Sequence, residues 1–324
     1  GRDADLVGLF PLARARLMQG ALLPAIEFYS NPYICSTAPL IDRDAAPEVW
    51  HCFFEALRRA DDMPKVLLTL QMPSLGGAFL ALEQAMRSEQ LNYAVIERFA
   101  RAAVRRNDSE DAYLATMSSG RRKELRRKLR RLSELGAIEF RIVTDPAEKP
   151  AALAAFLALE QSGWKARTGT ALACTPETRA FAEQAFLSDA SEIDVLTLNG
   201  QPLAMTINLV RDEAMFAVKT AYDEAYSSFS PGVHLDMWTV RKLFEPGTGY
   251  SRIDSCAIPG HPIEAVWTDK EPIISLAMAT RPDVTQARID QFTRLMVTFN
   301  RLKTWVKEQI GSKGEAGDGE AKPA

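Results

Sequence analysis

The spacing of apolar residues in the first third of the chain alternates between helical and strand-like periods. Residues 47–60 place large apolar side chains at helical spacing, whereas 65–70 form a short apolar run of strand length. Ser74 is expected to cap a helix that reaches about residue 88, and 92–104 again have the pattern of a strand. Strands separated by helices predict a mixed α/β sheet.

From residue 137 onward the pattern is more regular, and turn residues bound each predicted element. The expected order is a strand at 137–143, helices at 148–163 and 176–190, strands at 192–198, 201–210 and 214–221, a helix at 232–245, a strand at 250–254, a short helical segment near 264–267 and a strand at 272–279. Asn199 and Gly200 form a dipeptide that strongly predicts a two-residue hairpin turn. A last helix is expected over 282–310. The Gly-rich, charged residues 311–324 lack a hydrophobic face and predict a disordered tail.

Composition is that of a soluble globular protein with room for two domains. The chain has 324 residues, 47% of them hydrophobic and 25% charged. A formal net charge of -3 argues against a general nucleic-acid binder, so we expect no DNA partner. The four cysteines and three histidines lack the spacing of a metal site. No apolar run approaches the roughly 20 residues of a membrane span, and we expect a cytoplasmic protein with reduced thiols.

Residues 118–135 concentrate positive charge on one predicted helix. Leu125, Leu129 and Leu132 lie along one side of this helix, and Arg or Lys occupies most of the remaining positions between 121 and 131. One interpretation is an amphipathic linker whose charged face is solvated. The alternative is contact with the phosphates of a cofactor, with a membrane surface or with RNA.

The segment 219–235 is the best candidate for a ligand site. It leads from the end of an apolar strand through a polar loop to Ser-Pro-Gly at 230–232. Ser230 is a preferred N-cap, and Pro231 suits the first position of a helix. The amides of residues 232–234, together with the helix dipole, would then form an anion site that suits a phosphate or pyrophosphate. The alternative is an ordinary well-capped helix.

The order of elements over 137–279 resembles the Gcn5-related N-acetyltransferase (GNAT) fold. Three phrases, SGWKARTGTAL at 162–172, KTAYDEAYSSFSPGVHL at 219–235 and DSCAIPGHPIEAVW at 254–267, more closely resemble the CelD-type acetyltransferases of bacterial cellulose and exopolysaccharide loci. The N-terminal half resembles the degenerate first domain of such proteins, which is distantly related to FemAB peptidyltransferases. One departure is that the common GNAT phosphate motif, with its two small residues, is absent and 230–234 stand in its place.

This resemblance implies a mixed α/β protein with two tandem acetyltransferase-like domains. The expected parts are an incomplete or degenerate first domain at 1–117, a basic linker helix at 118–135, a catalytic domain at 136–280, a C-terminal helix at 281–310 and the tail at 311–324. We expect the first domain to lack its start, because the chain opens without Met in a strand-like segment at 6–12.

The resemblance also implies acetyl-CoA or another acyl-CoA as co-substrate, and no metal. The acyl-CoA would lie between two strands, with its pyrophosphate at the start of the helix near Gly232. The residues expected to bind it are Val218, Lys219, Thr220, Ser230, Pro231, Gly232, Val233 and His234. Backbone amides of the strand at 218–220 would stabilise the oxyanion that forms during acyl transfer.

Acyl transfer also needs a group that accepts and returns protons. Asp223 is the first candidate for the base, and His261 is the second because its pKa ordinarily lies near neutrality. Tyr222 adjoins Asp223, and Asp254 ends a strand where ligand-binding groups often lie. Each candidate has a structural alternative, Asp223 as a turn residue, His261 as a cap and Asp254 as a partner of its own loop. Direct transfer is favoured over a covalent intermediate on Cys256, because no base adjoins that thiol in the sequence.

The acceptor pocket is expected to include Trp164, Lys165, Tyr226 and Trp267, since an aromatic face can support a sugar or an acyl chain. Trp164 could equally fill the core. The implied function is N- or O-acyl transfer to a small-molecule or glycan acceptor in exopolysaccharide, cellulose or envelope metabolism, with the exopolysaccharide synthesis machinery as a partner. Two alternatives stay open. One is FemAB-like aminoacyl transfer from charged tRNA, with the basic helix as the RNA contact, and the other is a non-catalytic scaffold of a polysaccharide synthase complex.

Overall fold

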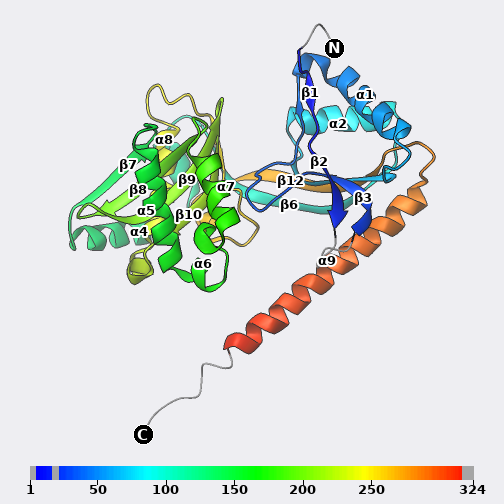
Figure 1. The fold of residues 1–324 in the computed structure, drawn as a ribbon. Helices are drawn as coiled ribbons and strands as arrows, with labels where there is room; N and C mark the ends of the chain where they lie inside the picture. Colours follow the sequence, from blue (N-terminus) through cyan, green and yellow to red (C-terminus); the bar gives the residue numbers. More distant parts are fainter. Residues whose placement is uncertain (1–4, 17–21, 316–324) are drawn as a thin grey trace. The chain divides into compact units, whose positions relative to one another are not determined.

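The computed structural model describes residues 5–16 and 22–315 and divides the chain into two compact units (Figure 1). Unit 1 comprises Gly1–Phe99 and Pro272–Ala324, and unit 2 comprises Ala100–Glu271. The chain passes between the units within β6 (Tyr93–Arg105) and β12 (Asp269–Ala279). These bounds differ from the expected ones, because most of β12 pairs with a strand of the first half of the chain. Of the expected tail, the residues from 316 lie outside the described part.

Unit 1 joins strands from both ends of the chain. Its elements are β1 (Gly8–Leu9), β2 (Leu12–Arg16), β3 (Leu22–Phe28), β4 (Leu40–Ile41), α1 (Ala46–Arg59), β5 (Val66–Pro73), α2 (Gly77–Ser88), the first part of β6, most of β12, and α9 (Gln286–Glu315). β2 pairs with β3 and β5 with β12 in antiparallel register, while β3 and β5 run parallel. The short strands β1 and β4 pair separately.

The start of α2 corrects one sequence prediction. Gly76 occupies its N-cap position, without a side-chain hydrogen bond. Ser74, the expected cap, instead donates to the Pro272 carbonyl through its amide at 2.9 Å and through its hydroxyl at 3.2 Å. A bond to the strand that pairs with β5 therefore replaces the local cap.

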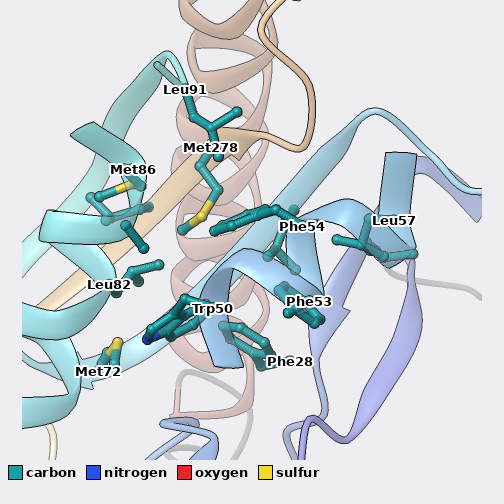
Figure 2. Packing of buried hydrophobic residues seen from close by; sticks show 14 of the residues in the cluster. Phe28, Trp50, Phe53, Phe54, Leu57, Met72, Leu82, Met86, Leu91 and Met278 are labelled. Atoms are coloured by element: carbon teal, nitrogen blue, oxygen red, sulfur yellow. The ribbon is translucent and has the colours of Figure 1, made fainter. Parts of the chain in front are cut away.

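An aromatic cluster holds α1 in the core of unit 1 (Figure 2). Trp50, Phe53, Phe54 and Leu57 repeat at helical spacing, as the sequence predicts, and all four are buried. The rings of Trp50 and Phe54 stack with centroids 5.7 Å apart. Phe28 of β3 packs against the same group, with its ring centroid 6.1 Å from that of Phe53. The apolar face of α1 is thus the reason why this segment folds as a helix on the strands.

Phe54→Ala is expected to lower the free energy of unfolding by about 3–5 kcal/mol, because the fully buried ring would leave a cavity. Urea unfolding followed by circular dichroism measures the change. Leu80→Ala is the control. Leu80 is 57% exposed, so its loss should stay within about 0.5 kcal/mol. Equal losses in the two variants would contradict this core.

Unit 2 contains the basic helix and most of the second run of predicted elements in the expected order, together with helices at 110–116 and 164–167 that were not predicted. Its elements are α3 (Glu110–Thr116), α4 (Ser119–Ser133), β7 (Ile138–Val143), α5 (Lys149–Ser162), α6 (Trp164–Arg167), α7 (Pro176–Phe186), β8 (Ser191–Leu198), β9 (Gln201–Arg211), β10 (Ala214–Tyr222), α8 (Pro231–Lys242) and β11 (Arg252–Asp254). The strands follow the order β11, β10, β9, β8, β7, in which β10 and β11 are parallel and the other neighbours antiparallel. The predicted mixed α/β class is confirmed.

Two local predictions in unit 2 are also confirmed. Asn199 and Gly200 have φ values of 51° and 78°, and positive φ at both positions is what a type I′ hairpin turn requires. The basic helix forms as α4, and Ser118 caps it by accepting the Arg121 amide at 3.2 Å. Its buried Leu125 belongs to the core of unit 2, so α4 is packed on the domain through its apolar side.

Candidate functional site

β10 and β11 separate after the first third of β10. The parallel ladder joins residues 214–216 of β10 to β11 and ends there, whereas β10 continues to Tyr222. On its other side β10 stays paired with β9 as far as Tyr222. We call the β11-facing side of residues 217–222 the opened edge. The ladder with β11 does not use the backbone groups along this edge, and the Thr220 carbonyl accepts Lys165 there.

A β-bulge lies at the beginning of the opened edge. The register with β9 shifts between Ala217 and Lys219, which leaves Val218 as the extra residue. Bulges often lie next to active sites, where they redirect backbone groups. The expected oxyanion donors at 218–220 therefore lie at the point where the two strands separate.

The start of α8 lies on one face of β10, and it corrects the expected cap. Pro231 is the first helical residue, as predicted. Ser230 is left-handed, with φ 58° and ψ 54°, and makes no side-chain cap bond. The His234 amide donates to the Ser230 carbonyl at 3.2 Å, so it does not belong to the anion site as expected. Within the described residues no acceptor is recorded for the amides of Gly232 and Val233, which remain candidates for binding an anion.

Cations from α4 adjoin the start of α8. Lys128 donates to the Ser230 hydroxyl at 2.9 Å and pairs with Glu124 at 3.1 Å. The Arg131 guanidinium carbon lies 5.8 Å from the centroid of the Phe229 ring, next to the same turn. A lysine beside the positive end of a helix dipole makes this turn favourable for an anion. This contact between the basic helix and the start of α8 was not predicted from the sequence.

His234 is a buried, neutral residue in the first turns of α8. It is 4% exposed, and its ring donates to the Phe229 carbonyl. The pKa of His234 is lowered to about 4, first by burial and then by the charges of Lys128 and Arg121. The bond to the Phe229 carbonyl acts in the opposite direction and raises this pKa. The imidazole is therefore uncharged near neutral pH and supports the turn rather than pairing with an anion.

His234→Gln is expected to reduce the loss of stability in acid. The unfolded imidazole titrates near its ordinary pKa of 6.5 and the folded one near 4, so between these values the unfolded chain binds the proton first. Stability therefore falls as the pH drops through this window and is unaffected above it. At pH 5 the loss amounts to about 2 kcal/mol. Urea unfolding at pH 7 and pH 5 should show the wild type losing about that much more than the variant, and equal losses would contradict a buried neutral His234.

A buried carboxylate joins two lysines on the opposite face of β10. Glu160 of α5 is fully buried, and its Oε1 lies 3.2 Å from Lys219 Nζ and 3.6 Å from Lys165 Nζ. Its other oxygen accepts the Leu172 amide at 2.7 Å. Lys165 also donates to the Thr220 carbonyl on the opened edge. We call Glu160, Lys165 and Lys219 the Glu160 cluster.

The two faces of β10 therefore carry different groups. A Cβ added at Gly232 would lie 3.6 Å from the Tyr222 ring and 3.9 Å from the Thr220 methyl, so these side chains point towards α8. Lys219 reaches Glu160 on α5 instead. Because successive side chains of a strand alternate, the anion-binding turn and the Glu160 cluster flank the same strand from opposite sides.

A pocket beside the Glu160 cluster brings together several expected residues. It is lined by Leu159, Glu160, Gly163, Trp164, Lys165, Thr220, Ala221, Tyr222 and Glu224. Trp164 is 46% exposed and is therefore not core filler. Burial lowers the pKa of Lys165, the carboxylate of Glu160 opposes this, and the ammonium of Lys219 lowers the pKa further. Glu160 itself was not predicted, and its only signal is a charged residue within an Ala- and Leu-rich helix.

Several other expected residues have structural partners. The Asp223 carboxylate accepts the Ala225 amide at 2.9 Å and caps the short 3-10 helix Glu224–Phe229, which is its turn alternative. Tyr226 packs against Phe229, with ring centroids 6.5 Å apart. Trp267 is fully buried and donates to the Asp236 carbonyl at 3.2 Å, so its expected acceptor contact is wrong.

Asp254 is the last residue of β11, and His261 lies in the loop that follows it. Asp254 is buried 3.6 Å from Arg101 and accepts the Cys256 amide at 2.8 Å, and burial raises its pKa. His261 Nδ1 accepts the Ile263 amide at 3.3 Å, which is the cap expected as its alternative. Burial lowers the pKa of His261, and the nearby charge of Lys165 adds to this. An Nδ1 that accepts a hydrogen bond leaves the proton of a neutral ring on Nε2, where it is a donor.

A buried ion network fixes α8 against β8. Lys242 Nζ lies 2.7 Å from Asp194 Oδ1 and also bonds to Glu192. The Thr239 hydroxyl donates to the other oxygen of Asp194 at 3.0 Å. Removing one partner of such a network leaves a buried charge unpaired, at a cost of about 3–5 kcal/mol. The start of α8 is thus held in place by contacts about two to three turns further along the helix.

Comparison with known proteins supports the GNAT-like fold. Residues 119–260 match the model of an acetyltransferase (GNAT) domain. Two solved structures have TM-scores of 0.53: the C-terminal DUF2156 domain of a protein assigned as a lysylphosphatidylglycerol synthetase from Agrobacterium fabrum (14% identity, 89% of this chain and 88% of that chain), and FemX (11% identity, 86% of each). L-PGS from Bacillus licheniformis has a TM-score of 0.51 at 12% identity, covering 88% of this chain and 89% of that one. Curated proteins give no significant match.

Two features are absent from the described residues. Within residues 5–16 and 22–315, no helix is both long and apolar enough to cross a membrane. In the same ranges, no group of three or more His, Cys, Asp or Glu side chains is arranged to hold a metal ion. The fold is mixed α/β and GNAT-like, and residues 119–260 match an acetyltransferase (GNAT) domain.

Proposed function

We propose that unit 2 transfers an acyl group from acyl-CoA to an amine or a hydroxyl by direct attack on the thioester. The observation that carries this proposal is the opened edge of β10, with a bulge at Val218 and the start of α8 beside it. A thioester needs backbone donors for its oxyanion, and its cofactor carries a pyrophosphate. The opened edge offers the donors, and the start of α8 offers an anion site.

The residues around the opened edge fit an acyl-CoA. The amides of Gly232 and Val233, with Lys128, would hold the pyrophosphate. The pantetheine chain has backbone groups to bind along the edge, and the amides at 218–220 would face the thioester carbonyl. Acyl-CoA supplies an activated acyl group and a thiolate leaving group. The acceptor would approach from the other face of β10, where Trp164 lines the pocket.

Proton transfer in this reaction has two parts. The acceptor loses a proton as it attacks the thioester carbon, and the departing thiolate gains one as the carbon–sulfur bond breaks. His261 suits the second part, because its bond from Ile263 leaves the proton of the neutral ring on Nε2. This changes its proposed role from base to acid. Asp223 stays a candidate base, although its carboxylate already caps a turn.

Gly232→Asp is expected to weaken acetyl-CoA binding by about tenfold or more, because a carboxylate would lie where the phosphate is placed. Gly232→Ala is the matched control. Its methyl group would meet Tyr222 and Thr220 only at ordinary contact distances, so its affinity should stay close to wild type. Calorimetry with acetyl-CoA measures both. A folded Asp variant with unchanged affinity would remove the phosphate site from this proposal.

The acceptor is proposed to be a small molecule or glycan of exopolysaccharide, cellulose or envelope metabolism. This part rests on the CelD-type phrases in the sequence, and the half-exposed Trp164 gives a sugar ring or an acyl chain a face to stack on. The expected partnership with exopolysaccharide synthesis machinery and the cytoplasmic location belong to the same proposal.

A second candidate is aminoacyl transfer from charged tRNA. Two observations favour it. The similarity to FemX and to the lysylphosphatidylglycerol synthetase domain covers more than four-fifths of each chain, and α4 exposes cations at Lys123, Arg126, Arg127 and Arg130. Calorimetry with acetyl-CoA and with tRNA, over a series of salt concentrations, separates the candidates. Saturable acetyl-CoA binding supports the first, tRNA binding with a steep salt dependence supports the second, and binding of neither supports a non-catalytic scaffold.

A further inference from the structure

We propose that Lys165 is the catalytic base, which takes the proton from the attacking amine or hydroxyl. This inference rests on the proposed acyl transfer and names a residue for the step that Asp223 was expected to perform. It follows from where the Lys165 ammonium nitrogen lies, from what it bonds to and from the charge around it.

Lys165 is held at the opened edge by one hydrogen bond and one close carboxylate. Its Nζ donates to the Thr220 carbonyl, two residues beyond the bulge, and lies 3.6 Å from Glu160 Oε1, beyond hydrogen-bond distance. These are the two oxygen neighbours recorded for this nitrogen among the described residues. A neutral amine has two N–H bonds and one lone pair, so it can keep the bond to the Thr220 carbonyl while the lone pair remains for a proton. Lys165 also lines the pocket next to Trp164.

The charge balance of the Glu160 cluster favours one neutral lysine. Lys165 and Lys219 share a single, fully buried carboxylate, and their side chains are only 21% and 12% exposed. With both lysines protonated, the cluster would carry an uncompensated positive charge in a place with little water, which is costly. Lys165 has its pKa lowered by burial and by Lys219, with Glu160 opposing. A lysine whose pKa is lowered towards neutrality can act as a base.

The neighbouring groups are less suited to this role. Lys219 donates to the Thr170 carbonyl at 2.7 Å and is the nearer of the two lysines to Glu160, at 3.2 Å. The Asp223 carboxylate is used by the Ala225 amide. His261 presents a donor when neutral, because its Nδ1 already accepts a bond. Glu160 is a positioning residue that holds both lysines and the Leu172 amide.

The proposed step balances in atoms and charge. The lone pair of the acceptor nitrogen or oxygen forms a bond to the thioester carbon while its proton moves to Lys165 Nζ. The carbonyl oxygen becomes an oxyanion, and its re-formation as a carbonyl breaks the carbon–sulfur bond. The thiolate leaves as CoA and takes up a proton, and Lys165 returns its own proton to solvent before the next cycle.

The first experiment measures the titration of Lys165 without any substrate. The intact chain is labelled with a trace of acetic anhydride across a pH series, and the peptides containing Lys165 and the exposed Lys123 are quantified by mass spectrometry. The labelling midpoint of Lys165 should lie below that of Lys123, whatever its accessibility. It should rise in Lys219→Met, where a repelling charge is lost, and fall in Glu160→Gln. A midpoint for Lys165 at or above that of Lys123 overturns the inference.

The second experiment measures thiol release from acetyl-CoA, with water or an added amine as the acceptor. Lys165→Arg is permanently charged and cannot accept a proton, so kcat should fall by about 10²-fold or more while KM for acetyl-CoA changes little. Lys165→Met should behave in the same way, and Lys65→Arg, at an exposed lysine with no part in either candidate function, should match the wild type. The acid limb of the kcat profile should move to higher pH in Lys219→Met.

The outcomes separate this inference from the function on which it rests. If Lys165→Arg retains kcat, or if only KM rises, Lys165 binds an anionic acceptor and is not the base. If Asp223→Asn abolishes kcat while Lys165→Arg does not, the base is Asp223. If calorimetry shows no acetyl-CoA binding, the proposed function fails and the base assignment fails with it. A lowered labelling midpoint would then describe only a buried lysine.

Discussion

The separation of β10 from β11 is the constraint on which the rest of unit 2 depends. Their ladder ends at Phe216 and Asp254, and the bulge at Val218 redirects the strand at once. An edge that is opened in the middle of a sheet exposes backbone groups that folding would otherwise pair. The start of α8 and the Glu160 cluster then lie on the two faces of the strand that carries this edge. A donor and an acceptor can thus reach one strand from opposite sides.

Burial of charge holds both flanks in place. On one side, Lys242 bonds to Glu192 and Asp194 and so fixes α8 to β8. On the other side, Glu160 collects two lysines and a backbone amide. The two clusters differ in their balance: in the first one cation meets two carboxylates, whereas in the second two cations meet one. Each cluster therefore has one buried charge in excess: burial raises the pKa of Glu192 in the first and lowers the pKa of Lys165 in the second.

Local patterns were sufficient to predict much of the fold. The period of the apolar residues in α1, the hairpin at Asn199 and Gly200, and Pro231 at the start of α8 are set by neighbours in sequence, and all three are confirmed. The predicted caps Ser74 and Ser230 were wrong, because their hydroxyl groups bond to residues distant in sequence. The Ser74 hydroxyl donates to the Pro272 carbonyl, and the Ser230 hydroxyl accepts from Lys128. β3 and α3 were not predicted at all.

The site was predictable only in part, because Glu160 has partners that lie far from it in the sequence. Trp164, Lys165, Thr220 and Tyr222 do line one pocket, as the phrases around them suggested. The role of Glu160 becomes visible only in the structure, where Lys219 approaches it from another element.

Amide hydrogen exchange with and without acetyl-CoA tests the placement of the donor along the opened edge most directly. Bound acetyl-CoA should slow exchange at 217–220 and at the amides of Gly232 and Val233. Unchanged exchange in both segments at a saturating concentration would contradict the placement of the donor along the opened edge.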